Sequence, residues 1–193
     1  MLNSPVSYII YNDIFTPGEC DKIIEQGLKG NYDPGNISDH TEQNINKDIR
    51  DTELYFFNDQ EIIGKIAPAV NAANQENNWN FELTHAESFQ LTVYSEQGHY
   101  NWHVDSHPSP YNNDGPLNGL VRKISFSVIL NDGFEGGQME FASPIPNQPT
   151  QLVEGLTKGS ILIFPSYTAH KVNAVTKGQR YSLVSWICGN PWR

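Results

Sequence analysis

The chain has 193 residues, a formal net charge of −10 and 38% hydrophobic residues, with 15 glycines and 12 prolines scattered along it. This length suits one sizeable hydrophobic core, so we expect a single domain over residues 1–193. The acidic balance argues against nucleic acid or an anionic membrane as a partner, because both would require clustered lysine and arginine. It permits a basic protein or peptide partner, although solubility alone also explains it.

The N-terminal segment and the cysteines predict a cytoplasmic protein. Residues 1–15 contain no basic leader and only a short apolar stretch broken by tyrosine and asparagine, so we expect neither a signal peptide nor a membrane span. Cys20 and Cys188 lie at opposite ends of the chain and match no Cys-x-x-Cys pattern. Two reduced thiols are therefore expected rather than a disulfide.

Short strands and one helix are predicted over the first 57 residues. Residues 6–11 are typical of a strand, and the TPGE sequence at residues 16–19 supplies an N-cap threonine, a first-turn proline and a capping-box glutamate. The helix that follows should end near Leu28. The polar, turn-forming residues 31–48 predict a loop, and residues 49–57 predict a single strand.

A second helix and then a series of strands follow. Asn58 is the predicted N-cap of a helix bent by Pro68, in which apolar residues recur at helical spacing: Ile62, Ile63, Ile66 and Val70. Beyond Trp79, strands are predicted between glycine- and proline-rich turns: apolar and polar residues alternate over residues 89–94, 123–130 and 180–186, and residues 161–164 form a continuous apolar run. Helices packed on an antiparallel sandwich or barrel are therefore expected, with polar strand faces lining an interior site.

His103 and Asp105 form a candidate metal-binding pair. Residues i and i+2 of a strand point to the same face, about 6.5 to 7 Å apart, and their side chains can converge on one ion. His107 is too far along a strand to complete the site, so the third ligand should come from another strand. His170 follows the most apolar strand and precedes Arg180 by ten residues, which makes it the favoured candidate over a hydrogen-bonded core histidine.

Two imidazoles and one carboxylate leave coordination positions open on the other side of a metal. This arrangement suits ferrous iron in oxygenases that bind a cosubstrate together with O₂. Arg180 on the same interior surface would pair with the far carboxylate of a dicarboxylate ligand. Arg50 could also reach the pocket, but a surface salt bridge is the favoured interpretation for it.

These residues resemble a known family. The chain resembles the 2-oxoglutarate- and Fe(II)-dependent oxygenases, within them the prolyl 4-hydroxylase-like group and most closely the PKHD-type hydroxylases. The likeness covers about residues 85–190. It rests on the signature Tyr94, Gly98, Tyr100, His103 and Asp105, on the strands RKISFSVILN (122–131) and EGGQMEF (135–141), and on residues 158–180.

The resemblance implies an α+β, mainly β fold: a double-stranded β-helix of the jelly-roll or cupin type over residues 85–190. Residues 1–84 would supply N-terminal helices and flanking strands, with the helices packed on one sheet. Fe(II) would be held by His103, Asp105 and His170. With 2-oxoglutarate and O₂, and ascorbate as a candidate reductant, the enzyme would hydroxylate an aliphatic C–H and release succinate and CO₂.

The resemblance also assigns roles around the metal. Arg180 would bind the C5 carboxylate of 2-oxoglutarate, with Tyr94 and Ser127 as further cosubstrate contacts. Many relatives carry a tyrosine where this chain has Ile129, so Ser127, Tyr94 or a water molecule would have to replace that contact. The substrate would be contacted by Tyr100, Arg122 and Trp186.

The residues alone leave the substrate open. A prolyl or other residue of a protein or peptide is the favoured substrate, and a free amino acid or other small metabolite is the alternative. A non-enzymatic jelly roll with a structural metal, or a zinc hydrolase using the same three ligands, would account for the metal-binding pattern without 2-oxoglutarate. The glycine- and proline-rich segment 106–119 is equally consistent with a lid over the substrate and with a surface loop.

Overall fold

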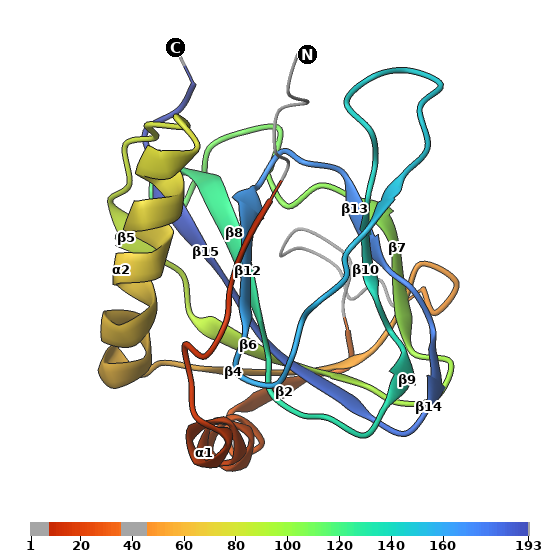
Figure 1. Cartoon of the computed structure of the whole chain (residues 1–193). Coiled ribbons are helices and arrows are strands. Elements are labelled where there is room, and N and C mark those ends of the chain that lie inside the picture. The colour runs from red at the N-terminus through yellow and green to blue at the C-terminus, as the bar shows by residue number, and fades with distance from the viewer. Residues whose placement is uncertain (1–7, 36–45, 193) are drawn as a thin grey trace.

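Two antiparallel sheets face each other, and both helices lie on the outer side of the larger sheet (Figure 1). The structure is a computed structural model that describes residues 8–35 and 46–192. In it the helices are α1 (Pro17–Gly27) and α2 (Gln60–Glu76). Among the described residues, no helix is long and apolar enough to cross a bilayer.

The larger sheet has eight strands. In spatial order seven of them are β1 (Ile9–Tyr11), β12 (Ile161–Pro165), β8 (Val121–Ile129), β15 (Arg180–Gly189), β6 (Phe89–Tyr94), β4 (Glu53–Phe57) and β2 (Asn31–Asp33). The eighth, β5 (His85–Ala86), pairs with the end of β15.

The smaller sheet has five strands in the order β11 (Gln151–Leu152), β10 (Met139–Phe141), β13 (His170–Val172), β7 (His99–His103) and β3 (Arg50–Asp51). A separate two-stranded ribbon joins β9 (Glu135–Gly136) to β14 (Val175–Lys177). All of these pairings are antiparallel, as the alternating patterns predicted.

Alternation along the central strands divides apolar from polar side chains. On β6, Leu91 and Val93 face the helices and belong to the main hydrophobic core, while Gln90, Thr92 and Tyr94 face the space between the sheets. A second, smaller core inside the sandwich contains Tyr94 together with residues of the five-stranded sheet. The predicted polar interior and helix-facing apolar surface are therefore confirmed.

The first helix begins as predicted. The Thr16 side chain accepts a hydrogen bond from the Glu19 backbone, and the Glu19 carboxylate accepts one from the Thr16 backbone. The second helix begins one residue later than predicted: Asp59, not Asn58, is its N-cap, and its carboxylate accepts from the backbone of Glu61 and Ile62.

Two predictions for the N-terminal half were wrong. Residues 31–33 of the predicted loop form the edge strand β2, while residues 36–45 of that loop lie outside the described part of the chain. The predicted single strand 49–57 divides at Thr52 into β3 and β4, which pair in different sheets. The chain thus crosses from one sheet to the other at this point, and β3 is placed against the metal-binding strand β7.

Candidate active site

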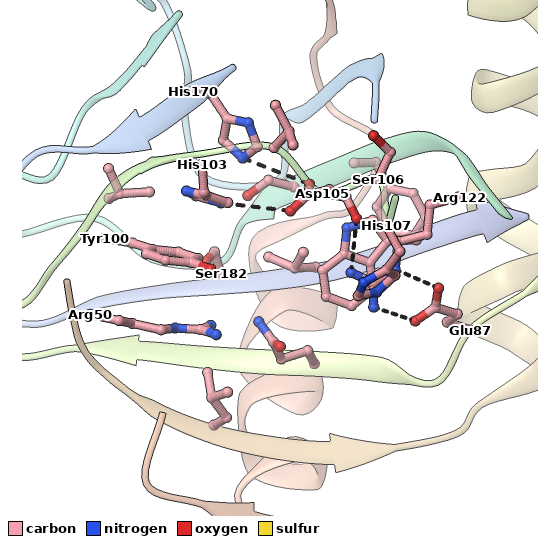
Figure 2. A pocket seen from close by; sticks show the side chains of 18 of the residues that line it. Arg50, Glu87, Tyr100, His103, Asp105, Ser106, His107, Arg122, His170 and Ser182 are labelled. Atoms are coloured by element: carbon pink, nitrogen blue, oxygen red, sulfur yellow. Dashed lines mark hydrogen bonds and ion pairs between the residues drawn. The ribbon is translucent and has the colours of Figure 1, made fainter. Parts of the chain in front are cut away.

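A cavity of roughly 1030 Å³ opens between the two sheets. This volume is at the upper end of the range of about 300 to 1,000 Å³ that is typical of small-ligand pockets. Its lining includes the three predicted metal ligands, the predicted cosubstrate contacts Tyr94, Ser127 and Arg180, and the predicted substrate contacts Tyr100, Arg122 and Trp186. Figure 2 shows how several of these side chains converge on it.

Strand pairing brings His103, Asp105 and His170 together. His103 ends β7 and lies directly opposite His170 on β13, so the two rings come within 4.2 Å between centroids. One candidate ligand atom from each of the three residues lies within 4.8 Å of the other two. The prediction that both members of the His-x-Asp pair lie in a strand was wrong for Asp105, which follows the end of β7.

Backbone contacts fix Asp105 outside the strand. The amides of Asp105 and Ser106 both donate to the Ser166 carbonyl, at 2.9 and 3.0 Å. The carboxylate then lies 3.6 Å from Nε2 of His103 through one oxygen and 3.7 Å from Nε2 of His170 through the other. Burial alone would raise the pKa of this carboxyl, but the two imidazoles and the Arg122 guanidinium lower it to about 2.

Both imidazoles are oriented as metal ligands require. Nδ1 of His103 lies 2.7 Å from the Asn101 carbonyl, and Nδ1 of His170 lies 2.9 Å from the Thr168 carbonyl. A carbonyl accepts only, so Nδ1 carries the proton and the Nε2 lone pair points toward Asp105. Burial, with a contribution from His170, lowers the pKa of His103 to about 4, so its ring is neutral near pH 7. A neutral His103 imidazole and an ionised carboxylate fit ferrous iron.

Arg180 lies deep in the cavity and is only 2% exposed. Its Nη1 donates to the Ser182 hydroxyl at 3.0 Å, and its guanidinium carbon lies 5.1 Å from the centre of the Tyr94 ring. No carboxylate among the described residues forms an ion pair with it, and burial lowers its pKa. A buried guanidinium without an acidic partner fits the far carboxylate of a dicarboxylate ligand.

Gly137 makes room for this arginine. Its φ is +67°, and a Cβ there would lie 2.9 Å from Cδ of Arg180. On the neighbouring strand β8, Ile129, which stands where many relatives carry a tyrosine, is buried and pairs with Ser182. The Ser182 hydroxyl, which the sequence analysis did not name as a site residue, is the neutral partner of Arg180.

Arg122 and Trp186 form another wall of the cavity. Two nitrogens of Arg122 donate to the two oxygens of Glu87, each at 2.6 Å, and the guanidinium carbon lies 3.6 Å above the Trp186 ring. Glu87 also accepts from the hydroxyl of Tyr111 at 2.8 Å. The sequence analysis missed Glu87 because it belongs to none of the recognised motifs. The Trp186 Nε1 is buried and has no hydrogen-bond partner among the described groups.

Tyr100 supports the metal site from one side. Its ring stacks on His103 with centroids 3.6 Å apart, and Arg50 lies on its other face at 4.5 Å. The expected surface salt bridge of Arg50 was wrong, since this residue is only 7% exposed and lines the cavity. By contrast, the two ring nitrogens of His99 lie 2.9 and 3.3 Å from the backbone carbonyls of Gln97 and Asp48, and His99 is not part of the cavity lining.

The segment between β7 and β8 covers part of the cavity. Ser106, His107 and Tyr111 are among its residues that line the cavity, and Tyr111 is fixed by its hydrogen bond to Glu87. His107 lies beside Tyr111, with ring centroids 5.4 Å apart, and does not join the three metal ligands. The segment therefore forms a wall of the site in this structure.

Comparisons with known proteins agree with this geometry. A PKHD-type hydroxylase of Idiomarina loihiensis is 31% identical over 99 residues, which cover 50% of this chain but only 40% of that protein. The structure of a viral collagen prolyl hydroxylase from Paramecium bursaria Chlorella virus-1 superposes with a TM-score of 0.67 at 19% identity, over 98% of this chain and 99% of that one. A Trichoplax adhaerens prolyl hydroxylase, solved with a peptide fragment of hypoxia-inducible factor, gives 0.65 at 18% identity, over 96% and 84%.

The structural likenesses establish the fold and confirm the expected double-stranded β-helix with helices on one sheet. The curated relatives extend well beyond the part that this chain matches. The family model of the 2OG-Fe(II) oxygenase superfamily matches residues 89–188, which span His103, Asp105, His170 and Arg180. The chain belongs to the 2OG-Fe(II) oxygenase superfamily.

Proposed function

We propose that the protein is an Fe(II)- and 2-oxoglutarate-dependent dioxygenase that hydroxylates an aliphatic C–H of a prolyl residue in a protein or peptide. The observation that carries this proposal is the presence, in one cavity, of a His-Asp-His ligand set and of the buried Arg180, which forms no ion pair with any carboxylate of the described residues. A structural metal site or a zinc hydrolase has no need for the second feature. Membership of the superfamily and the names of the relatives support the same reaction.

Each group of residues has a defined part in this reaction. His103, Asp105 and His170 would hold Fe(II), and Tyr100 would keep the His103 ring in place by stacking on it. Arg180 would bind the C5 carboxylate of 2-oxoglutarate, with Ser182 orienting its guanidinium. Once bound, Fe(II) and 2-oxoglutarate supply O₂ activation, with release of succinate and CO₂ and transfer of one oxygen atom to the substrate carbon.

The cavity walls support a substrate larger than 2-oxoglutarate alone. Trp186 lies six residues after Arg180 on β15, and together with Arg122, Glu87 and Tyr111 it lines a further part of the cavity. The prolyl substrate is favoured by the structural relatives, which are named as prolyl hydroxylases and of which one holds a peptide. Cys20 and Cys188 are both buried and unlinked, in keeping with action in a reducing cytosol.

Turnover of 2-oxoglutarate tests the proposal directly. Purified protein is incubated with Fe(II), O₂, 2-oxoglutarate and proline-containing peptides. Succinate formation is quantified, and the masses of the peptides are measured by mass spectrometry. We expect succinate together with a peptide mass increase of one oxygen, and neither product from His103→Ala. Failure to bind 2-oxoglutarate, or hydrolysis with bound zinc in place of oxidation, would contradict the proposal.

A further inference from the structure

Arg50 occupies an unusual position for a positively charged residue. Strand β3 pairs with β7, which places Arg50 opposite Tyr100 and turns its side chain into the cavity. In Figure 2 its guanidinium lies below Tyr100, which in turn lies below His103. Its Nε donates to the Thr52 hydroxyl at 3.0 Å. Arg50 is therefore a cavity-lining cation with only 7% of its surface exposed, and the Tyr100 ring separates it from the metal ligand His103.

No carboxylate among the described residues lies within ion-pair distance of Arg50. Asp105 is directed at the two histidines, Glu87 at Arg122, and Asp33, which also lines the cavity, forms no ion pair with Arg50. Among the described residues, the printed hydrogen bond of the Arg50 side chain runs from Nε to Thr52, and its terminal nitrogens are accessible from the cavity. Burying a guanidinium in this way is costly unless a ligand completes its pairing.

Assigning a partner to each charge in the cavity shows which arginine has no carboxylate beside it. Glu87 offsets Arg122, and the C5 carboxylate of 2-oxoglutarate would offset Arg180. Asp105 and the second carboxylate of 2-oxoglutarate would together offset the two positive charges of Fe(II). Asp33, which also lines the cavity, brings the total charge to zero, but with metal and cosubstrate in place Arg50 is still the cavity arginine that has no carboxylate at ion-pair distance among the described residues.

We propose that the primary substrate presents a carboxylate to Arg50, so that this residue determines specificity for acidic substrates. This inference rests on the proposed function, since it assumes that Arg180 serves the cosubstrate. The carboxylate could belong to an acidic residue close to the target in a peptide, or to a free amino acid. Both sources offer the same planar pair of oxygens, which a guanidinium binds through two parallel hydrogen bonds.

Equilibrium binding tests this without requiring turnover. One probe set consists of peptides Ac-Ala-Ala-Pro-Ala-Ala-NH₂ in which each alanine in turn is replaced by aspartate or, as its neutral twin, asparagine. The other set is L-proline with L-prolinamide. Calorimetry measures binding to the protein alone and to protein holding Mn(II) and N-oxalylglycine, an unreactive 2-oxoglutarate analogue. The variants are Arg50→Gln, Arg50→Met and Lys47→Gln, with thermal melting as a check on folding.

We expect at least one acidic probe to bind about tenfold or more tightly than its amide twin, the effect of one charge-assisted pair. Both neutral variants at Arg50 should abolish this preference. Lys47→Gln should keep it, because Lys47 is an exposed cation on the same segment, paired with Asp51. Tighter binding of an aspartate peptide than of its asparagine twin would identify an acidic peptide as the substrate class. Tighter binding only of proline over prolinamide would identify a small amino acid instead.

Equal binding of every acid and amide pair would overturn the proposal, as would a preference that survives in both neutral variants. Weaker N-oxalylglycine binding in Arg50→Gln, with the probe preference unchanged, would assign Arg50 to the cosubstrate instead. Absence of succinate formation would remove the oxygenase proposal, but these measurements would still decide what Arg50 binds.

Discussion

The two sheets of the sandwich contribute different parts of the site and are supported differently. The five-stranded sheet supplies His103 and His170, and its outer face is partly open, with Trp102 and Leu152 each 43% exposed. The eight-stranded sheet supplies Arg180 and Ser182 and is backed by α1 and α2. The two histidine ligands thus lie on the five-stranded sheet, and the carboxylate clamp lies on the eight-stranded sheet that carries the main core. Variants on the two sheets should therefore separate metal binding, cosubstrate binding and stability.

The largest effect is expected from the five-stranded sheet. His103→Ala removes one of the three protein ligands of the metal. Loss of a residue that only hydrogen-bonds to a ligand typically lowers metal affinity or activity about 10- to 100-fold. We therefore expect loss of the ligand itself to lower turnover by at least about 1,000-fold. Anaerobic Fe(II) titration and succinate formation measure this. The matched control is His99→Ala on the same strand, whose ring binds only backbone carbonyls and should leave both readouts unchanged. Normal turnover in His103→Ala would remove the assigned metal site.

Loss of core packing behind the eight-stranded sheet should have the next largest effect. Leu91 is fully buried, and α1 approaches it so closely that a Cβ at Gly27 would lie 2.7 Å from a Leu91 methyl group. Leu91→Ala should therefore lower the free energy of unfolding by about 2 to 5 kcal/mol. The comparison variant Leu152→Ala, on the five-stranded sheet, should cost about 0.5 kcal/mol or less, because Leu152 is 43% exposed. Similar decreases in the free energy of unfolding in urea for Leu91→Ala and Leu152→Ala would show that the two sheets are equally well packed at these positions.

The sequence predicted the metal side of this comparison better than the substrate side. His103, Asp105 and His170 could be predicted because a short motif and one strand pairing bring them together, even though Asp105 lies beyond its strand. Arg180 could be predicted because it begins a regularly alternating strand. In each case the residue types and their spacing in the sequence were enough to predict that the side chains line the same site.

The residues that were missed depend on contacts between distant segments. Glu87 and Arg122 are 35 positions apart, and nothing local to either indicates that they pair. For Arg50 a surface salt bridge was favoured over a place in the pocket, and residues 49–57 were predicted to form one strand. The division at Thr52, which moves β3 into the other sheet and buries Arg50, follows from pairing with β7 rather than from any local pattern.

The cosubstrate clamp gives a third, smaller effect. Arg180→Ala should weaken 2-oxoglutarate binding roughly 30-fold or more, equivalent to about 2 kcal/mol, because it removes one partner of a buried charge pair. Fe(II) affinity should stay within about twofold of the original, since Arg180 lies on the other sheet. Parallel titrations with Fe(II) and 2-oxoglutarate measure both. Unchanged 2-oxoglutarate affinity would place the clamp elsewhere, and loss of Fe(II) binding would show that the sheets do not act separately.

The smallest effect is expected at the beginning of α1, on the outer side of the eight-stranded sheet. Thr16→Ala removes the side chain that accepts from the backbone of Glu19, and an N-cap of this kind contributes about 1 kcal/mol to the free energy of unfolding. Thr16→Ser retains the hydroxyl and should restore most of that loss. Because the cap lies on the face of the sheet away from the cavity, 2-oxoglutarate affinity should be unchanged in both variants. Weaker 2-oxoglutarate binding in Thr16→Ala, at a temperature where the protein stays folded, would mean that a change at the start of α1 alters the binding site around Arg180.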